Sequence, residues 1–472
     1  MSVARINTGV ITRFAPSPTG FVHLGNIRTA LFNVLLAHKQ GGDFLLRIED
    51  TDAERSKNEF TAALMQDMRW LGLNWEQGPD DDTGKPGAYH QSQRQHLYQV
   101  HYDSMQESGK VYPCFCSAQR LAVLRKIQLS AGQPPRYDGM CAHLSKDEVE
   151  KKLAEGQKST LRFRVPSATE VTFTDLVRGE QRFASDDIGD FIIRRGDGTP
   201  AFFFTNAIDD ALMGVTHVLR GDDHLTNTPR QLMLLQALSM REPEYGHISL
   251  IVGNDGAPLS KRNGSMGIRD MREAGYLPEA IVNYLSRLGH YYADNSFMSV
   301  DGLAAQFDTS HLGKAPAHFD LIQLQHWQKE ALNAADDDTV WQWLGEAVHK
   351  NVPVDKKDLF LKVIKPNINN PDQGLDWAKV FFGDELTIED DAQQAIDEAG
   401  KEFFGIAARV FAEEADFKTA IKTIGKQTGK KGKQLFWPVR AALTGKVHGP
   451  EMSDLSLLLG VEKIVERCKR AG

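Results

Sequence analysis

Cysteine and long hydrophobic runs are scarce in this sequence, and each scarcity excludes a class of protein. Four cysteines among 472 residues cannot build a disulfide framework, and their uneven spacing is typical of thiols kept reduced in a cytosol. No apolar run approaches the roughly 18 residues that a membrane span needs, and no apolar leader follows Met1. We therefore expect a cytoplasmic protein without a membrane partner.

Strong charge and sequence repetition are also missing. The formal net charge of -8 argues against a protein that coats nucleic acid by bulk attraction, although local basic faces can still bind phosphates. The sequence has no internal repeat and no low-complexity tract. Its length allows roughly three domains, each with its own core, which favours a multi-domain enzyme.

The first part of the chain alternates strand-like and helix-like segments. "VITRF" (residues 10–14) and "DFLLRIEDTD" (residues 43–52) predict strands, whereas residues 27–40 and 57–73 carry apolar residues at helical spacing. Such alternation predicts a parallel, doubly wound sheet.

A second module interrupts this alternation. Residues 77–89, rich in Gly, Pro and Asp, predict a loop. After this loop come three of the cysteines, a helix that the capping box of Ser145 and Glu148 opens, and strand-like runs within residues 161–177. We therefore expect a separate module that begins near this loop.

The alternation returns further along the chain and is then lost. "GDFIIRR", "THVLRGDDH" and "ISLIV" predict strands, with a helix before the last of them, so the second module is expected to be inserted into the first. From about Asp301 onward the strands vanish and the remaining segments have helical periodicity. This pattern predicts an all-α C-terminal domain.

Two short stretches indicate a phosphate site. "APSPTGFVHLGN" (residues 15–26) predicts a turn from strand to helix, where the helix N-terminus and Gly25 admit a phosphate and His23 can donate to it. "GAPLSKRNGS" (residues 256–265) places Lys261 and Arg262 among small residues, as a loop that grips a polyphosphate requires. Taken singly, such a histidine is more often a structural hydrogen-bonder and such a basic loop is more often solvated surface.

Together these stretches resemble the signatures of the class I aminoacyl-tRNA synthetases, as "HLGN" and "PLSKR". More narrowly, the sequence is similar to the bacterial glutamyl-tRNA synthetases. The similarity rests on "RFAPSPTG", "LLRIEDTD", "VLRGDDHLTNTPRQ", "GYLPEAIVNYLSRLG" and "LFWPVRAALTGKVHGP". These stretches follow one another over almost the whole chain, which is far more specific than either signature alone.

The resemblance implies an α/β fold: a Rossmann-like doubly wound parallel sheet with an inserted module, followed by an all-α anticodon-binding domain. The expected divisions are residues 1–86 for the first half of the catalytic domain, 87–200 for the acceptor-end-binding insertion, 201–253 for the second half, 254–337 for the "SKR" loop and stem-contact region, and 338–472 for the anticodon-binding domain. The implied partner is tRNA(Glu), and the protein is expected to be a monomer.

The family activates L-glutamate with ATP and Mg²⁺ and then transfers it to the terminal ribose of tRNA. The resemblance assigns catalysis to His23, Lys261 and Arg262, and ATP binding to His23, Gly25, Asn26, Ser260 and Lys261. One departure is Pro258, which stands where the loop signature has its first lysine. Slower or differently gated loop closure is the expected consequence.

The resemblance also assigns a glutamate site, made of Arg13, Ala15, Ser17, Glu49, Phe202, Asn206 and Arg220. Glu49 can accept from an α-ammonium, and the arginines can bind a carboxylate. Arg220 matches the arginine that distinguishes the glutamyl from the glutaminyl branch, because a neutral amide would leave the guanidinium unpaired. Phe202 departs from the tyrosine common in the family and lacks its hydroxyl.

The cysteine cluster has the composition of a zinc site. Cys114, Cys116, Cys141 and His143 provide three thiols and an imidazole in two pairs, as a closed tetrahedral site requires. Such a site would be structural and would hold the inserted module together. The alternative is reduced, buried cysteines beside a chance histidine.

A basic stretch lies near the C-terminus. Residues 418–446 contain no acidic residue, and lysines spaced four apart share one helical face. The expected tRNA contacts are Lys418, Lys422, Lys426, Lys430 and Arg440. A solvated charged face is the alternative.

Other functions remain open on the sequence. A relaxed enzyme would also charge tRNA(Gln), and a small-molecule adenylyltransferase would need neither Arg220 nor the helical domain. The truncated relatives that glutamylate a modified base lack the helical third. A non-catalytic RNA-binding paralogue should have lost His23 or Lys261, and both are present.

Overall fold

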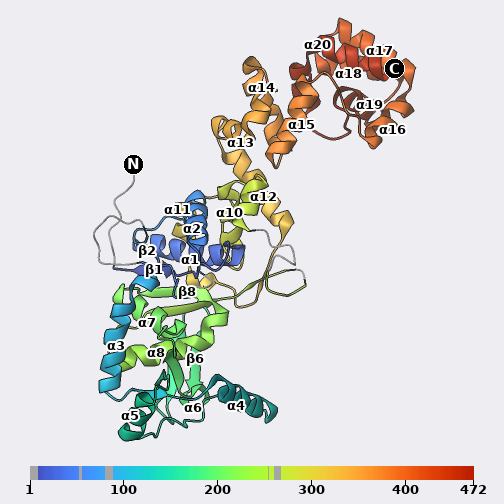
Figure 1. Ribbon diagram of the computed structural model, residues 1–472. Helices are drawn as coiled ribbons and strands as arrows, with labels where there is room; N and C mark the ends of the chain where they lie inside the picture. The colour runs from blue at the N-terminus through green and yellow to red at the C-terminus, as the bar shows by residue number, and fades with distance from the viewer. Residues whose placement is uncertain (1–8, 53–55, 80–88, 254, 260–266) are drawn as a thin grey trace. The chain divides into compact units, whose positions relative to one another are not determined.

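The computed structural model describes residues 9–52, 56–79, 89–253, 255–259 and 267–472 (Figure 1). The chain divides into two compact units. One contains Met1–Asp270 with Val282–Asp320, and the other contains Met271–Ile281 with Leu321–Gly472. No helix in the described ranges is long and apolar enough to cross a membrane.

A parallel sheet lies at the centre of the first unit. It consists of β1 (Ile11–Phe14), β2 (Asp43–Leu46), β8 (His217–Gly221) and β9 (Glu244–Ile248) in the order β2-β1-β8-β9. The chain runs from β1 outward to β2 on one side and from β8 outward to β9 on the other. Such a change of direction opens a crevice at the carboxyl ends of the two middle strands. The predicted parallel sheet is confirmed.

Helices cover both faces of this sheet. α1 (Leu24–Gln40) packs on β1, β2 and β8, ends at Gly41 in the left-handed conformation, and buries a continuous apolar side. α7 (Phe202–Leu212) and α8 (Thr228–Ala237) pack with Val218 of β8 and Tyr245 of β9 in one hydrophobic cluster. Side chains alternate between the faces of a strand, so Arg220 projects to the same face as Val218.

The side chain of Asn33 links α1 to β8 at the point where β1 no longer pairs with β8. The residue is fully buried, and β1 pairs with β8 only at Thr12 and His217. Two residues further along β8, the Asn33 side chain donates to the Leu219 carbonyl at 2.9 Å and accepts from the Leu219 amide at 3.3 Å. The amide side chain therefore takes the place of a neighbouring strand and lets β1 and β8 separate.

The segment between β2 and α7 forms its own small sheets. Its elements are α2 (Asn58–Trp70), η1 (Gln91–Gln93), α3 (Gln95–Glu107), β3 (Val111–Cys114), α4 (Ala118–Ser130), α5 (Lys146–Ala154), β4 (Thr160–Phe163), β5 (Glu170–Asp175), β6 (Gly179–Ala184), α6 (Ser185–Ile188) and β7 (Phe191–Arg194). The order β3-β4-β7 is antiparallel, and β5 with β6 forms a hairpin. The capping box of Ser145 and Glu148 is confirmed at the start of α5.

Two sequence-based strand predictions are wrong in detail. "GDFIIRR" becomes β7, which pairs antiparallel with β4 of the insertion rather than resuming the parallel sheet. "ISLIV" is split, because β9 ends at Ile248 and a separate strand, β10 (Ile251–Val252), pairs with β11 (Ala317–His318). Because β11 lies beyond Asp301, strands also do not vanish there.

The remaining elements of the first unit are short, and those of the second unit are all helices. The former are η2 (Asp222–Asn227), α9 (Ile268–Glu273), α10 (Pro278–Arg287), α11 (Val300–Gln306) and η4 (Thr309–His311), of which α9 and α10 cross the division. The latter are α12 (Leu321–Ala334), α13 (Asp337–His349), η5 (Val354–Lys356), α14 (Lys357–Ile364), η6 (Lys365–Asn367), α15 (Pro371–Phe382), α16 (Asp390–Ala399), α17 (Lys401–Glu413), α18 (Phe417–Thr428), α19 (Lys433–Thr444) and α20 (Met452–Ala471). The predicted helical C-terminal region is confirmed.

We expect Asn33→Leu to destabilise the protein by about 2 to 4 kcal/mol, because each buried backbone group left unpaired costs about 1 to 3 kcal/mol. Urea denaturation followed by circular dichroism measures the effect. Asn58→Leu, at an exposed position of α2, is the matched control and should change the midpoint little. Equal shifts for the two variants would contradict the role assigned to Asn33.

Candidate active site

A cavity of about 580 Å³ opens at the carboxyl ends of β1 and β8. Every described residue that the sequence assigns to the ATP and glutamate sites lines it: Arg13, Ala15, Ser17, His23, Gly25, Asn26, Glu49, Phe202, Asn206 and Arg220. These residues come from both halves of the parallel sheet, so the crevice between β1 and β8 brings them together.

His23 occupies the turn from β1 to α1. It is the N-cap residue of α1, but its side chain makes no capping hydrogen bond, so the imidazole is free to face the cavity. Desolvation lowers the pKa of this imidazole from its usual value. A Cβ at Gly25 would lie 3.3 Å from His23 Nδ1, so glycine leaves room for the ring.

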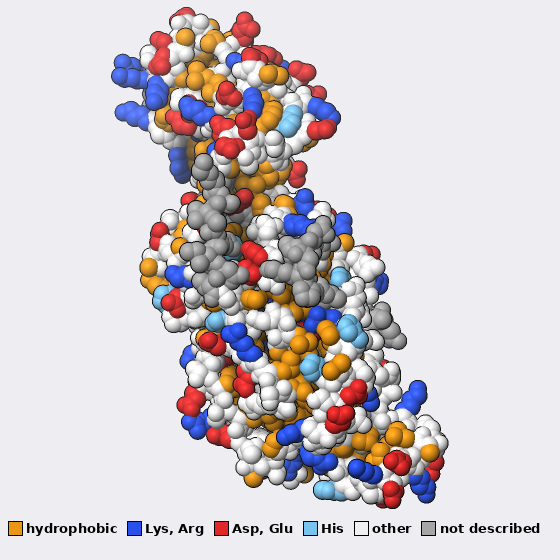
Figure 2. All heavy atoms as spheres, turned by 90° about the vertical axis from the view of Figure 1, so that its left-hand side faces the viewer, with side chains coloured by type: hydrophobic (Ala, Val, Ile, Leu, Met, Phe, Trp, Pro, Cys, Tyr) orange, Lys and Arg blue, Asp and Glu red, His pale blue; other side chains and the backbone are white. Residues whose placement is uncertain are grey.

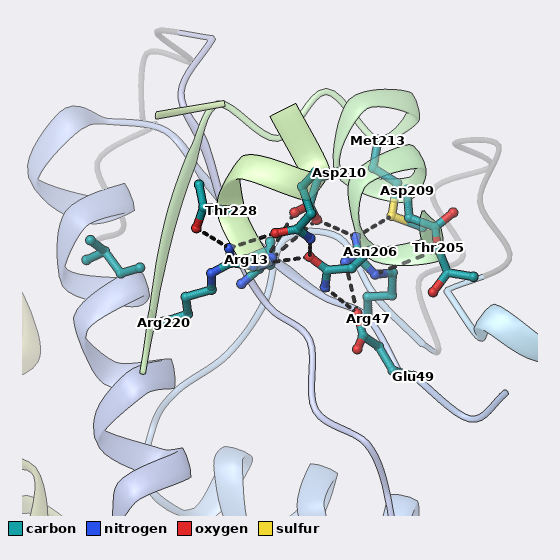
Figure 3. Close-up of polar contacts among 12 residues, drawn as sticks. Arg13, Arg47, Glu49, Thr205, Asn206, Asp209, Asp210, Met213, Arg220 and Thr228 are labelled. Carbon is teal, nitrogen blue, oxygen red and sulfur yellow. Dashed lines mark hydrogen bonds and ion pairs between the residues drawn. The ribbon is translucent and has the colours of Figure 1, made fainter. Parts of the chain in front are cut away.

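Buried charges pair beneath the cavity (Figure 3). Arg13 binds Asp210 through Nε and Nη2, both at 3.2 Å. Arg47 Nη1 also binds Asp210, through Oδ1 at 2.7 Å, and Arg47 Nη2 binds Glu49 at 3.2 Å. Burial alone would raise the pKa of Asp210, but Arg13 and Arg47 outweigh it and lower the value. The two guanidinium groups are therefore neutralised within the protein.

Glu49 keeps one oxygen available. Its Oε1 accepts from Asn206 at 2.7 Å and from Arg47, whereas the buried Oε2 has no partner among the described residues. Burial raises the pKa of this carboxyl. A cationic donor placed at Oε2 would satisfy the oxygen and stabilise its ionised form.

Arg220 differs from Arg13 and Arg47 because all its partners are neutral. Nε donates to His247 Nε2 at 3.1 Å, and Nη2 donates to Thr228 Oγ1 at 2.8 Å and Gln231 Oε1 at 2.7 Å. Nη1 is buried and has no partner among the described residues, and burial lowers the Arg220 pKa to about 10. A buried guanidinium in this state calls for an anion.

A hydrogen-bonded chain joins the two unsatisfied groups. Glu49 accepts from the Asn206 amide, and Asn206 Oδ1 in turn accepts from Gln231 Nε2 at 2.8 Å. Gln231 Oε1 accepts from Arg220. Two residues that line the cavity, Glu49 and Arg220, therefore each have a buried polar atom without a partner among the described residues, and one network connects them. This arrangement suits a ligand that carries both an ammonium and a carboxylate.

Of the other predicted positions, Phe202 lines the cavity. Phe202 is the first residue of α7, and its ring centroid lies 5.4 Å from that of His224. Ser260, Lys261 and Arg262 lie outside the described residues. Pro258 just before them forms an antiparallel bridge with Val252, which fixes the stem of the segment.

The cysteines form a separate cluster in the insertion. The sulfur atoms of Cys114, Cys116 and Cys141 lie within 4.8 Å of one another. The fourth polar group is the Tyr137 hydroxyl, 3.4 Å from Cys114 Sγ and 3.3 Å from Cys116 Sγ, whereas His143 is exposed and outside this group. Hydrogen bonds from Tyr137 and Arg162 outweigh burial and lower the Cys114 pKa to about 7. Three clustered thiols, one of them readily ionised, fit a zinc ion.

The basic C-terminal residues are not all equivalent. Lys418, Lys422 and Arg440 line a cavity of about 520 Å³ with the apolar side chains of α18 and α19. Lys426 is exposed on α18 outside this lining, and Lys430 donates to the Ala399 carbonyl at 3.1 Å. Basic side chains mark one margin of this unit in Figure 2. Lys430 therefore has a structural contact that the sequence did not indicate.

Comparison with known proteins identifies the family. The family model of the class I tRNA synthetases (E and Q), catalytic domain, matches residues 9–326, and an anticodon binding domain matches residues 321–472. The chain belongs to the class I tRNA synthetases for glutamate and glutamine. Members of this family with similar sequences include glutamate–tRNA ligase 2 of Nitrosococcus oceani, 57% identical over 98% of both chains, and that of Alkalilimnicola ehrlichii, 53% identical over 98% of this chain and 97% of the other.

A solved structure of the family is also similar over the whole length. The glutamate tRNA ligase of Elizabethkingia meningosepticum, determined in complex with its amino acid, has a TM-score of 0.87 and 27% sequence identity. The match covers 98% of this chain and 99% of that one. Both parts of the synthetase architecture, the α/β catalytic domain and the helical anticodon domain, are thereby established.

Sequence reasoning missed several buried charged residues that lie next to the predicted site residues. Arg47, Asp209 and Asp210 are fully buried, and Asp209 binds Arg94 and Tyr98, each at 2.7 Å. Their signal was present in the sequence, because charged residues inside the apolar runs "FLLRI" and "NAIDDA" must be paired when buried. Tyr137 had no such signal, since spacing along the chain does not identify a hydroxyl that folds back onto the thiols.

Arg47 is paired with carboxylates and Arg220 is not, so substitutions of the two arginines should change the free energy of unfolding by different amounts. We expect Arg47→Met to cost about 3 to 5 kcal/mol, because it removes the cation that pairs with the buried Glu49 and leaves Asp210 with Arg13 alone. Arg220→Met leaves no carboxylate unpaired and should cost less than about 2 kcal/mol. Urea denaturation of both variants compares them. A larger loss for Arg220→Met would contradict the assignment of Arg220 as an unpaired cation.

Proposed function

We propose that this protein is a glutamate–tRNA ligase that activates L-glutamate with ATP and transfers it to the 3'-terminal adenosine of tRNA(Glu). The observation that carries the proposal is Arg220, a buried guanidinium with neutral partners and a free Nη1, in the same cavity as the free Oε2 of Glu49. The side-chain carboxylate of glutamate matches Arg220, and its α-ammonium matches Glu49.

Glutamine would bind less well than glutamate at this position. Its side-chain amide can accept a hydrogen bond from Arg220 but brings no negative charge, so the buried cation would stay uncompensated. A site built around an unpaired charge therefore selects the acid over the amide.

The first chemical step joins glutamate to ATP. An oxygen of the α-carboxylate attacks the α-phosphorus, the bond to the β-phosphate oxygen breaks, and pyrophosphate leaves. Catalysis of this type depends on positioning and on neutralising charge. His23 and the N-terminus of α1 face the cavity where the phosphate would lie. We assign Gly25, Asn26 and Ser260 to ATP binding, and Lys261 with Arg262 to the leaving pyrophosphate and its Mg²⁺.

The second step transfers glutamate to RNA. The terminal ribose hydroxyl attacks the activated carbonyl and AMP leaves, so no covalent enzyme intermediate is needed. The match of residues 321–472 to an anticodon binding domain supports tRNA as the acceptor. It also disfavours a small-molecule adenylyltransferase, which would not need this domain. We propose Lys418, Lys422 and Lys426 as tRNA contacts, with Lys430 and Arg440 weaker candidates because each donates to a backbone carbonyl.

A zinc ion is proposed to hold the insertion together. Cys114, Cys116 and Cys141 would bind it, and the Tyr137 hydroxyl is better placed than His143 to be the fourth ligand. The ion would supply a structural link between β3 and the segment around Cys141, and no chemistry. We further propose that the enzyme acts as a cytoplasmic monomer.

Charging of purified tRNA isoacceptors with labelled glutamate tests the function. We expect tRNA(Glu) to be charged with glutamate and not with glutamine, and His23→Ala to lower the rate about 10²- to 10³-fold. Charging of tRNA(Gln) as well would identify a relaxed enzyme. Failure to charge either acceptor would overturn the proposal and favour a small-molecule acceptor.

Metal analysis after gel filtration tests the zinc site. We expect about one zinc per chain, as a closed structural site holds, and loss of the zinc in Cys141→Ser. His143→Ala should retain it, because the imidazole lies outside the thiol cluster. Cys468→Ser is the matched control, a buried cysteine elsewhere. Loss of zinc in His143→Ala and not in Cys141→Ser would contradict the proposed ligands.

A further inference from the structure

A buried histidine lies directly behind the carboxylate-binding arginine. His247 on β9 is the register partner of Arg220 on the adjacent β8, so both side chains project to the same face of the sheet. His247 is fully buried, and its Nε2 accepts from Arg220 Nε at 3.1 Å. An imidazole nitrogen that accepts this bond carries no proton, so the ring must be neutral with its proton on Nδ1.

Asp175 fixes that proton. Asp175 Oδ2 lies 2.5 Å from His247 Nδ1 and accepts a hydrogen bond from the Nδ1–H group. Both side chains are fully buried. Asp175 Oδ1 accepts from the backbone amides of Val177 at 2.9 Å, Arg178 at 2.7 Å and His247 at 3.1 Å. The carboxylate is thus held by its own turn and aligned with the imidazole, and an aligned carboxylate selects the tautomer of a histidine.

Asp175 belongs to the insertion, not to the parallel sheet. It ends β5, and the turn that follows packs on β9, where the Leu176 amide donates to the Tyr245 carbonyl at 2.8 Å. A Cβ at Gly246 would lie 3.2 Å from Leu176 Cβ and 2.6 Å from Leu219 Cδ2, so glycine permits this close approach. The hairpin of β5 and β6 is therefore seated against the strand that carries His247.

We propose that Asp175 and His247 are positioning residues for glutamate, which hold Arg220 with Nη1 directed at the substrate carboxylate. Asp175 sets the tautomer of His247, and His247 fixes the Arg220 guanidinium through Nε. Thr228 and Gln231 fix Nη2, which leaves Nη1 as the free donor. This inference rests on the proposed function. It gives the insertion a part in recognising the amino acid, in addition to any part in binding RNA.

The isosteric variant Asp175→Asn tests the coupling. Its carbonyl oxygen can keep the backbone bonds of Oδ1, but its NH₂ faces Nδ1 and forces the proton onto Nε2, where it opposes Arg220 Nε. We expect KM for glutamate in tRNA(Glu) charging to rise about tenfold or more, with KM for ATP changed less than about twofold. Glu180→Gln, an exposed carboxylate of the same hairpin, is the matched control and should behave as wild type.

Two variants of His247 give a second test that does not depend on Asp175→Asn folding. His247→Gln can keep an acceptor near the position of Nε2, whereas His247→Asn reaches only the position of Nδ1. We expect His247→Asn to raise KM for glutamate more than His247→Gln. In the His247→Gln background, Asp175→Asn should add less than about twofold, because no tautomer remains to be set.

The outcomes separate this inference from the proposed function. A wild-type enzyme that does not charge tRNA(Glu) with glutamate overturns both. An active wild type with an unchanged glutamate KM in Asp175→Asn overturns the positioning role alone. Independent, multiplying effects of the Asp175 and His247 substitutions, or equal rises of the KM for glutamate and the KM for ATP, also overturn it.

Discussion

The structure depends on one electrostatic constraint, the buried guanidinium of Arg220, which has no counter-ion among the described residues. Removing a charge from water is costly, and proteins normally offset that cost with a paired charge of opposite sign. Arg13 and Arg47 follow this rule through Asp210 and Glu49, but Arg220 has only neutral oxygen and nitrogen partners. The uncompensated cation makes the cavity selective for a carboxylate, because a bound carboxylate supplies the negative charge that Arg220 lacks.

The fold places this cation by separating two neighbouring strands. β1 and β8 pair only at Thr12 and His217, and beyond that point an asparagine from α1 satisfies the β8 backbone. The opening that results is the cavity, and the residues that line it come from the ends of β1 and β8, the turn into α1, and α7. Sheet topology, helix placement and substrate site are therefore consequences of the same divergence.

Local features of the sequence were good predictors of local structure. The apolar periodicity of α1 and the capping box of α5 depend on residues a few positions apart, and both are confirmed. Family motifs went further, because "RFAPSPTG", "HLGN", "LLRIEDTD" and "VLRGDDHLTNTPRQ" each carried at least one residue that the fold brings to one cavity. Ten residues from four separate stretches line that cavity.

Contacts across the chain were harder to predict. "GDFIIRR" reads as a strand in either sheet, and only the pairing of β7 with β4 decides between them. His143 has the right spacing for a ligand, but it is exposed and outside the thiol group, whereas the Tyr137 hydroxyl contacts the thiols. Lys430 shares the charge of its neighbours, but its amine reaches a helix C-terminus. In each case the deciding quantity is a three-dimensional register that composition and spacing do not contain.

The packing of the β5–β6 hairpin on β9 has a consequence for how the sequences of such proteins can evolve. An inserted segment is commonly treated as an interchangeable cassette, exchanged between relatives to alter the nucleic acid that they bind. Here Gly246 allows the close contact with Leu176 of the hairpin turn, and the Asp175 carboxylate of the hairpin reaches a buried histidine of the catalytic sheet. Recombination that replaced the insertion without its matching strand would leave a steric conflict or an unaligned imidazole, so the two segments are expected to be inherited as a pair.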